Sequence, residues 1–202
     1  MIQEFKLTCG RCEEELSVNF YDLLPLDKTN KKLLKTNDLF TVVCPKCQNK
    51  IKLNYDCVLV DEKNRYALAL VVEDEDKEKV ISLFANHDQN YRKRIVKNQQ
   101  EALEKTFIFD SHLNDYAIEI MKAVHKIGLL KEFGSDTDLK IYYTREPIVC
   151  FVILMNGESY SLPFEKDFYD QVVSDYLNED ETNFKEVDYD WAVRILSEEV
   201  NA

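Results

Sequence analysis

Four of the six cysteines stand in two Cys-x-x-Cys pairs, Cys9 with Cys12 and Cys44 with Cys47. This spacing is the shortest that lets two sulfurs of one turn reach the same ion, and thiolate is a preferred ligand of zinc in structural sites. In a reducing compartment such pairs indicate a metal or redox centre before they indicate disulfides. The sequence therefore predicts one tetrahedral Zn²⁺ site made of these four cysteines.

Two other functions use the same residue types. A rubredoxin-like iron centre has four thiolates at similar spacing, but its knuckles usually have Gly where this chain has Glu13 and Gln48. A thioredoxin-type redox site needs a helix directly after the motif, to lower the thiol pKa. The second pair is followed instead by alternating residues, 51–55, which indicate a strand. Structural zinc is the favoured interpretation, with both alternatives open.

The remaining candidates for chemistry are few. Cys57 and Cys150 lie in apolar runs and are expected to be small core residues. Asp110, His112 and Asp115 offer oxygen and nitrogen ligands near the start of a predicted helix, although capping also explains acids there. The sequence has no glycine-rich phosphate loop, nucleophile elbow or His-Glu-x-x-His motif. An enzymatic site around these three residues is therefore an alternative, and a noncatalytic protein is favoured.

One basic strand is the candidate surface for a nucleic acid or a protein partner. It places aromatic and basic side chains together, as proteins that bind single strands do: Tyr91, Arg92, Arg94 and Lys97. Glu101 and Glu104 follow closely and could pair with these cations. We therefore expect a charge-paired strand, with nucleic-acid binding as a further alternative.

Charge and hydropathy limit the classes of partner. The formal charge is −12, from 26 basic and 38 acidic residues, so the surface should repel nucleic-acid backbones and anionic lipid at long range. No apolar run approaches the length of a membrane helix, and the first residues do not resemble a signal peptide. We expect a cytoplasmic protein that binds another protein, not a membrane.

The N-terminal elements repeat one unit. Alternating residues at 4–8 and 16–20 predict strands on either side of the first Cys pair, and 39–43 and 51–55 predict the same around the second. A short helix or turn over 27–36 separates the two units. Each unit presents two sulfurs on a tight turn, so a shared ion would couple the folding of both.

The rest of the chain predicts mixed structure. Further strands are expected at 58–60, 66–72 and 91–96, with helices at 77–84, at 98–106 and from a Ser111 cap to Gly134. Residues after 134 predict strands at 139–144, 147–155 and 158–162, and helices at 164–177 and 191–200. The predicted class is α+β: a zinc-ribbon-like region with helices packed on it over 1–134, and a small α+β subdomain over 135–202.

Several of these segments together resemble the CpXC family, which is named for two Cys-Pro-x-Cys motifs. They are the paired knuckles, Leu39-Phe40 before the second pair, the basic strand leading into residues 98–105, and Ile108 to Asp110 with Leu113 to Asp115. The resemblance spans roughly residues 5 to 130 and implies a bacterial metal-binding domain, without indicating an activity. Gly10 stands where the first motif would have Pro, and Gly also permits a tight turn.

The sequence thus favours a zinc-binding, noncatalytic protein-interaction or regulatory module. The two alternatives are an enzyme or enzyme subunit built on Asp110, His112 and Asp115, and a nucleic-acid-binding zinc ribbon that uses Arg92 and Arg94.

Overall fold

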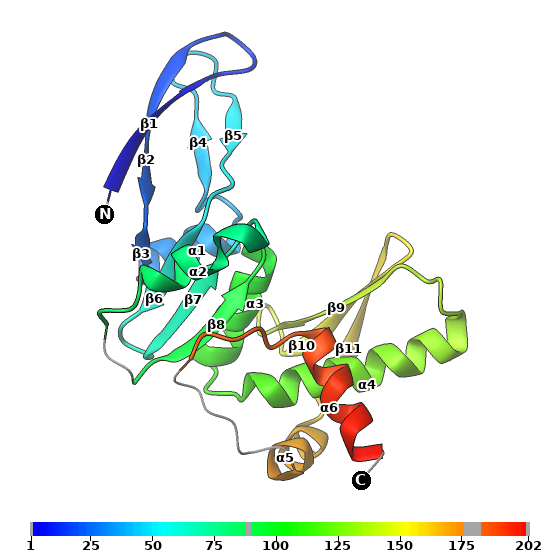
Figure 1. The fold of residues 1–202 in the computed structure, drawn as a ribbon. Coiled ribbons are helices and arrows are strands. Elements are labelled where there is room, and N and C mark those ends of the chain that lie inside the picture. The colour runs from blue at the N-terminus through cyan, green and yellow to red at the C-terminus, as the bar shows by residue number, and fades with distance from the viewer. Residues whose placement is uncertain (1, 88–89, 176–182, 201–202) are drawn as a thin grey trace. The chain divides into compact units, whose positions relative to one another are not determined.

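The computed structural model describes residues 2–87, 90–175 and 183–200 (Figure 1). It has helices and several separate sheets, which confirms the predicted α+β class. The chain divides into two compact units, one of Met1–Leu103 with Glu181–Lys185, the other of Glu104–Asp180 with Glu186–Ala202. The predicted boundary between residues 134 and 135 stays a prediction.

Two hairpins begin the first unit. Strands β1 (Ile2–Thr8) and β2 (Glu15–Tyr21) pair antiparallel around the first Cys pair. Strands β4 (Thr41–Val43) and β5 (Lys50–Lys52) do the same around the second. Helix α1 (Lys28–Lys35) lies between the hairpins in sequence, and the Asp27 side chain caps it by accepting a hydrogen bond from Asn30 N. The predicted repeat of strand, knuckle and strand is therefore present twice.

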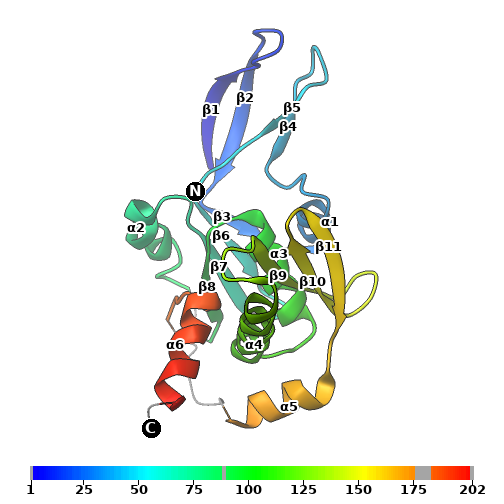
Figure 2. The same ribbon diagram turned by 90° about the vertical axis from the view of Figure 1, so that its right-hand side faces the viewer.

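A four-stranded mixed sheet forms the body of the first unit, in the order β3-β6-β7-β8. Its strands are β3 (Leu23–Pro25), β6 (Cys57–Asp61), β7 (Tyr66–Leu70) and β8 (Arg92–Val96). Every residue of β6 and β7 is buried, as in a sheet covered on both faces. The 3₁₀ turn η1 (Asp74–Asp76) leads into helix α2 (Lys77–Ser82), which packs on β6 and β7 (Figure 2).

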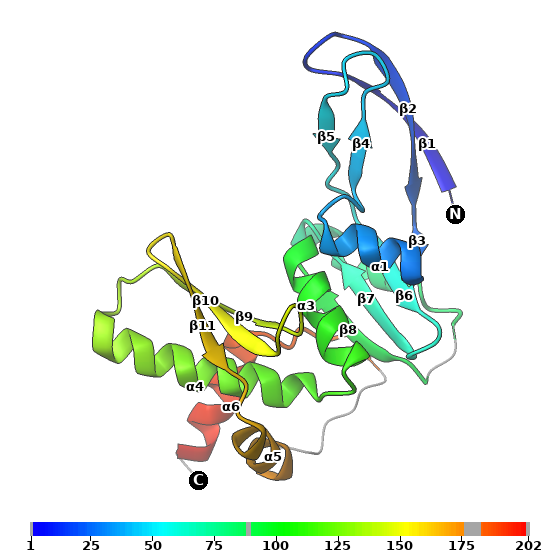
Figure 3. The same cartoon turned by 180° about the vertical axis from the view of Figure 1, so that it is seen from behind.

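The second unit combines one long helix with a small sheet (Figure 3). Helix α4 (Asp115–Phe133) packs against β9 (Leu139–Thr144), α5 (Lys166–Asp175) and α6 (Tyr189–Val200). Strands β10 (Cys150–Met155) and β11 (Glu158–Pro163) complete an antiparallel sheet in the order β11-β10-β9. A turn at Asn156 and Gly157 joins β10 to β11, and both residues have positive φ.

Helix α3 (Gln99–Asp110) runs from the first unit into the second and changes one detail of the prediction. Ser111 was expected to cap the long helix, but its N–H still donates to Phe107 O at the end of α3. Asn114 caps α4 instead, because its side-chain oxygen accepts from Tyr116 N at 2.9 Å. Among the described residues, no helix has the length and apolar character that a membrane span requires.

Candidate metal centre

The two knuckles have the same backbone hydrogen bonds. In the first, Cys9 N donates to Glu14 O at 2.8 Å and Glu13 N donates to Cys9 O at 2.9 Å. The second has the equivalent pair, Cys44 N to Asn49 O and Gln48 N to Cys44 O, both at 2.9 Å. The two turns therefore have the same hydrogen-bond pattern at equivalent positions of the sequence.

Each knuckle places one residue in the left-handed region just after its second cysteine. Glu13 has φ of 60° and Gln48 has φ of 59°. A side chain in this region costs roughly 1–2 kcal/mol, which explains why glycine is usual at this point of such turns. Gly10, in contrast, does not have positive φ, so its backbone conformation does not require glycine.

The knuckles bring the four thiols together into what we name the thiol cluster: Cys9, Cys12, Cys44 and Cys47. All four sulfurs lie within 4.8 Å of one another, and Cys9 Sγ to Cys47 Sγ and Cys12 Sγ to Cys44 Sγ are both 3.6 Å. Four sulfurs at about 2.3 Å from a central zinc would lie roughly 3.8 Å apart at tetrahedral angles. The cluster therefore has the size of a four-thiolate metal site and could hold one ion.

Backbone amides of the first knuckle stabilise negative charge on a cysteine sulfur. The N–H groups of Arg11 and Cys12 point at the Cys9 sulfur, and despite burial they lower the pKa of that thiol to about 6. At Cys12 the Glu14 amide acts in the same sense, but burial and the other sulfurs together raise the pKa to about 12. Without a cation, the second thiol keeps its proton because a neighbouring thiolate already holds the charge.

Polar and apolar side chains of the two hairpins surround the thiol cluster. The Lys46 ammonium lies 3.0 Å from the Glu14 carboxylate, which joins the second knuckle to the first at the surface. Asn49 Nδ2 lies 4.0 Å from Cys9 Sγ. Leu16 and Val18 of β2 are buried beside the sulfurs. The sulfurs are therefore screened from water on one side by apolar side chains.

An aromatic row supports the hairpins independently of the sulfurs. Phe5 lies 4.6 Å from Phe20, Phe20 stacks on Tyr55 at 4.3 Å, and Tyr55 meets the edge of Phe40 at 5.2 Å, all between ring centroids. Phe5 and Phe20 belong to the first hairpin, whereas Tyr55 and Phe40 flank the second. The hairpins thus meet both at the thiol cluster and along this row.

The sequence matches the model of one protein family, described as CpXC protein. The match covers residues 7–122, which is more than half of the chain. The chain belongs to the CpXC family. The match includes both Cys-x-x-Cys knuckles, which form the thiol cluster. No curated protein and no solved structure matches this CpXC chain.

The acidic and histidine residues of the enzymatic alternative take separate roles. Asp115 is completely buried, and its carboxylate accepts from Lys105 Nζ at 3.1 Å. His112 is exposed, with φ of 55°, in the turn between α3 and α4. Asp110 is the half-buried last residue of α3. The three do not form a metal-binding group in the part of the chain that the structure describes.

The predicted basic surface is largely inside the protein. Arg94 has no exposed area, and its guanidinium donates to Lys93 O at 2.8 Å. Tyr91 is 7% exposed and packs in the core against Phe84. Arg92 and Lys97 remain partly exposed, and Lys97 forms an ion pair with the Asp74 carboxylate. Burial therefore leaves Arg92 and Lys97 as the members of this group that reach solvent.

Of the two acids that were expected to pair with the basic strand, Glu101 contacts it and Glu104 does not. Glu101 does so through the backbone, since its carboxylate accepts from Lys97 N at 2.8 Å. Glu104 does not, because it accepts from Lys122 Nζ and from Tyr143 N at 2.6 Å in the second unit.

Sequence reasoning missed a second buried polar group, the lysine–carboxylate cluster of the second unit. Its members are Glu104, Lys105, Asp115, Glu119 and Lys122, all at most 9% exposed. Lys105 Nζ donates to Asp115, to Glu119 and to the Val187 carbonyl, while Lys122 Nζ donates to Glu104 and Glu119. Burial alone would lower the pKa of both lysines, but the adjacent carboxylates raise it above its usual range. The cluster therefore places three carboxylates around two lysines, and burial raises the pKa of Glu104, which favours the neutral form of that carboxyl.

Proposed function

We propose that this CpXC chain is a noncatalytic protein-interaction or regulatory module whose first unit is held together by structural zinc at Cys9, Cys12, Cys44 and Cys47. The observation that carries the proposal is the gathering of four thiols from two distant knuckles within 4.8 Å. Zinc in structural sites prefers four thiolates in a tetrahedron.

A structural role follows from the completeness of this ligand set. A catalytic zinc keeps one position open for water or substrate, whereas four protein thiolates fill all positions. Glu13 and Gln48 occupy left-handed positions where iron knuckles usually have glycine, which favours zinc over iron. An interaction role is supported by the size of the chain outside the cluster, which offers two units of surface around a site with no chemistry to perform.

Metal content tests the zinc part of the proposal. The purified protein should contain about one zinc per chain and be colourless, while Cys44→Ser should lose the metal and much of its stability. Cys57→Ala is the matched control, because Cys57 is buried in β6 outside the thiol cluster, and this variant should keep its zinc. If the wild type contains iron and has a red chromophore, the zinc proposal is wrong and the site is an electron-transfer centre.

Zinc dependence tests the interaction part. A protein partner isolated by affinity purification should bind the zinc-loaded chain, dissociate when a chelator removes the metal, and still bind His112→Ala. His112 is suited to this control because it is exposed in a turn and forms no ion pair in the part of the chain that the structure describes. Binding that survives loss of zinc, or that requires His112, would count against a zinc-held interaction surface.

A further inference from the structure

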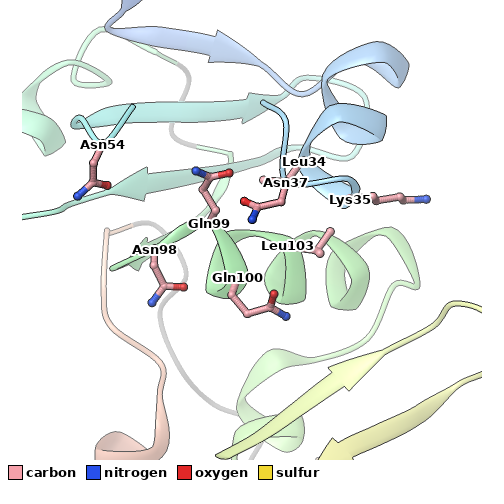
Figure 4. A pocket seen from close by; sticks show the side chains of 8 residues that line it. All are labelled: Leu34, Lys35, Asn37, Asn54, Asn98, Gln99, Gln100 and Leu103. Atoms are coloured by element: carbon pink, nitrogen blue, oxygen red, sulfur yellow. The ribbon is translucent and has the colours of Figure 1, made fainter. Parts of the chain in front are cut away.

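A cavity of about 310 Å³ in the first unit is lined mostly by carboxamides (Figure 4). It is formed by the end of α1, the segment just after β5 and the start of α3. Its lining consists of Leu34, Lys35, Asn37, Asn54, Asn98, Gln99, Gln100 and Leu103. Its volume is at the lower end of the range for small-molecule and peptide pockets.

Asn98 has a structural task that explains its place in the lining. Its side-chain oxygen accepts from Glu101 N at 3.0 Å, and its Nδ2 donates to the Glu101 carboxylate at 2.7 Å. This reciprocal pair caps the N-terminus of α3 in the manner of a capping box. Asn98 is therefore explained by the fold.

Asn37 is explained by the backbone, because its φ of 59° just after α1 is a left-handed conformation that Asn tolerates, and the other three carboxamides have no such task. Within the described residues, the side chains of Asn37, Asn54, Gln99 and Gln100 make no hydrogen bond to the protein. At Gln99 this has a cost, because its Oε1 is buried and has no partner. In Figure 4 the Gln99 carboxamide points from α3 toward the end of α1. A buried acceptor that the fold leaves unsatisfied is suited to a donor supplied by a ligand.

The chemistry of the lining selects the ligand. A carboxamide both donates and accepts, so its closest complement is another amide, such as the peptide groups of an extended chain. Leu34 and Leu103 add apolar contact for a side chain of that peptide. The lining holds no aromatic ring, so a nucleobase or a sugar would have no face on which to stack. Lys35 is the charged residue of the lining, and in Figure 4 its side chain extends away from the carboxamides.

We propose that this carboxamide pocket binds a short extended peptide segment of a protein partner, with Gln99 Oε1 accepting from a backbone N–H of that peptide. The inference rests on the proposed interaction module and names its binding site.

The pocket is also connected to the thiol cluster through the second hairpin. Asn37 precedes β4 and Asn54 follows β5, so these two rim residues flank the hairpin that carries Cys44 and Cys47. The base of this hairpin lies near Asn37 and Asn54 in the sequence, and there Leu53 N donates to Phe40 O at 2.8 Å. An ion at the tip fixes this hairpin and hence the rim, so peptide binding should require the metal.

The test is an NMR titration of the full zinc-loaded chain with the blocked peptide N-acetyl-Gly-Leu-Gly-amide. The side-chain NH₂ signals of Asn37, Asn54, Gln99 and Gln100 report directly on the pocket. We expect them to shift in a saturable way with a dissociation constant of about 1 mM, as for a fragment of the full ligand. Gln99→Leu should weaken binding about tenfold, because it removes one hydrogen bond from a buried position.

Gln171→Leu is the matched control, since Gln171 is exposed on α5 in the other unit and should leave binding unchanged. The proposal is overturned if the signals show no saturable shift at a peptide concentration about tenfold above the expected dissociation constant. It is also overturned if Gln99→Leu binds the peptide as tightly as the wild type. Stronger shifts with uridine or maltose than with the peptide would also overturn it. Zinc measured on the same sample separates the two claims: a loaded chain that ignores the peptide removes the pocket but leaves the zinc module.

Discussion

Each unit of the chain holds a cluster of ionisable side chains that lie close together, and the two clusters differ in whether they contain cations. The lysine–carboxylate cluster contains its own cations, and each lysine lies between two carboxylates. In the thiol cluster each sulfur lies 3.6 Å from another sulfur, and the pKa values of Cys9 and Cys12 move in opposite directions. We therefore expect the second unit to be complete without an added ion and the first unit to depend on a cation at the thiol cluster.

The largest expected effect is that of metal removal, and it should be confined to the first unit. Structural zinc contributes on the order of 10 kcal/mol or more to small thiolate sites. A strong chelator should make the amides of β1, β2, β4 and β5 exchange rapidly, while those of α4 stay protected. Hydrogen exchange with and without chelator measures this. Equal loss of protection in α4 would contradict the comparison, since it would make the second unit depend on the ion.

The converse change removes one of the two cations of the lysine–carboxylate cluster. Lys105→Met keeps the side-chain length but leaves Asp115 and Glu119 buried without this cation, and should destabilise the second unit by about 3–5 kcal/mol. Urea unfolding followed by fluorescence of Trp191, the only tryptophan of the sequence, reports on this unit.

Lys140→Met is the control for this change, because Lys140 is exposed on β9 and should alter the free energy of unfolding by less than about 0.5 kcal/mol. Zinc content should be unaffected in both variants. A Lys105→Met variant as stable as the control would mean that the carboxylates do not need the lysine.

A smaller effect is expected at the left-handed residue of the first knuckle. Glu13→Gly should relieve the strain of positive φ, and after the entropy cost of glycine the net gain is about 0.5–1 kcal/mol. Because knuckle stability and metal affinity are linked, competition with a chelator should report about two- to fivefold tighter zinc binding. Glu13→Ala keeps the strain but removes the charge, so an equal gain in that variant would assign the effect to charge.

The smallest effect tests the equivalence of the two knuckles. Gly10 occupies the position of Pro45, has no positive φ, and an added Cβ there would meet nothing within 4 Å. Gly10→Pro should therefore be accepted and stabilise the zinc-loaded unit by about 0.5 kcal/mol, because proline restricts the unfolded chain. A thermal melt of the loaded protein measures the gain. A loss of stability would mean that the first turn differs from the second in its backbone.

The thiol cluster could be predicted because its signal is local. Two Cys-x-x-Cys pairs with alternating residues on both sides specify two hairpins and two sulfurs each, whatever the rest of the chain does. Strand β3 escaped prediction since three residues ending in Pro25 carry no periodicity, and its parallel partner β6 lies far along the sequence. Ser111 and Asn114 are both good caps, and only the length of α3 decides between them.

The lysine–carboxylate cluster could not be predicted for a different reason. Asp115, Glu119 and Lys122 follow helical spacing in α4, which amphipathic reasoning assigns to the solvent face. Burial of that face depends on Lys105 and on packing by distant segments, including the Val187 carbonyl. The carboxamide pocket likewise joins residues 34–37, 54 and 98–103, and nothing in their local sequence indicates that they meet.

X-ray absorption at the metal edge of the purified, loaded protein tests the central claim most directly. Our account predicts zinc with four sulfur ligands at about 2.3 Å and no nitrogen or oxygen in the first shell. Fewer than four sulfurs, or iron in place of zinc, would contradict a closed structural zinc site at Cys9, Cys12, Cys44 and Cys47.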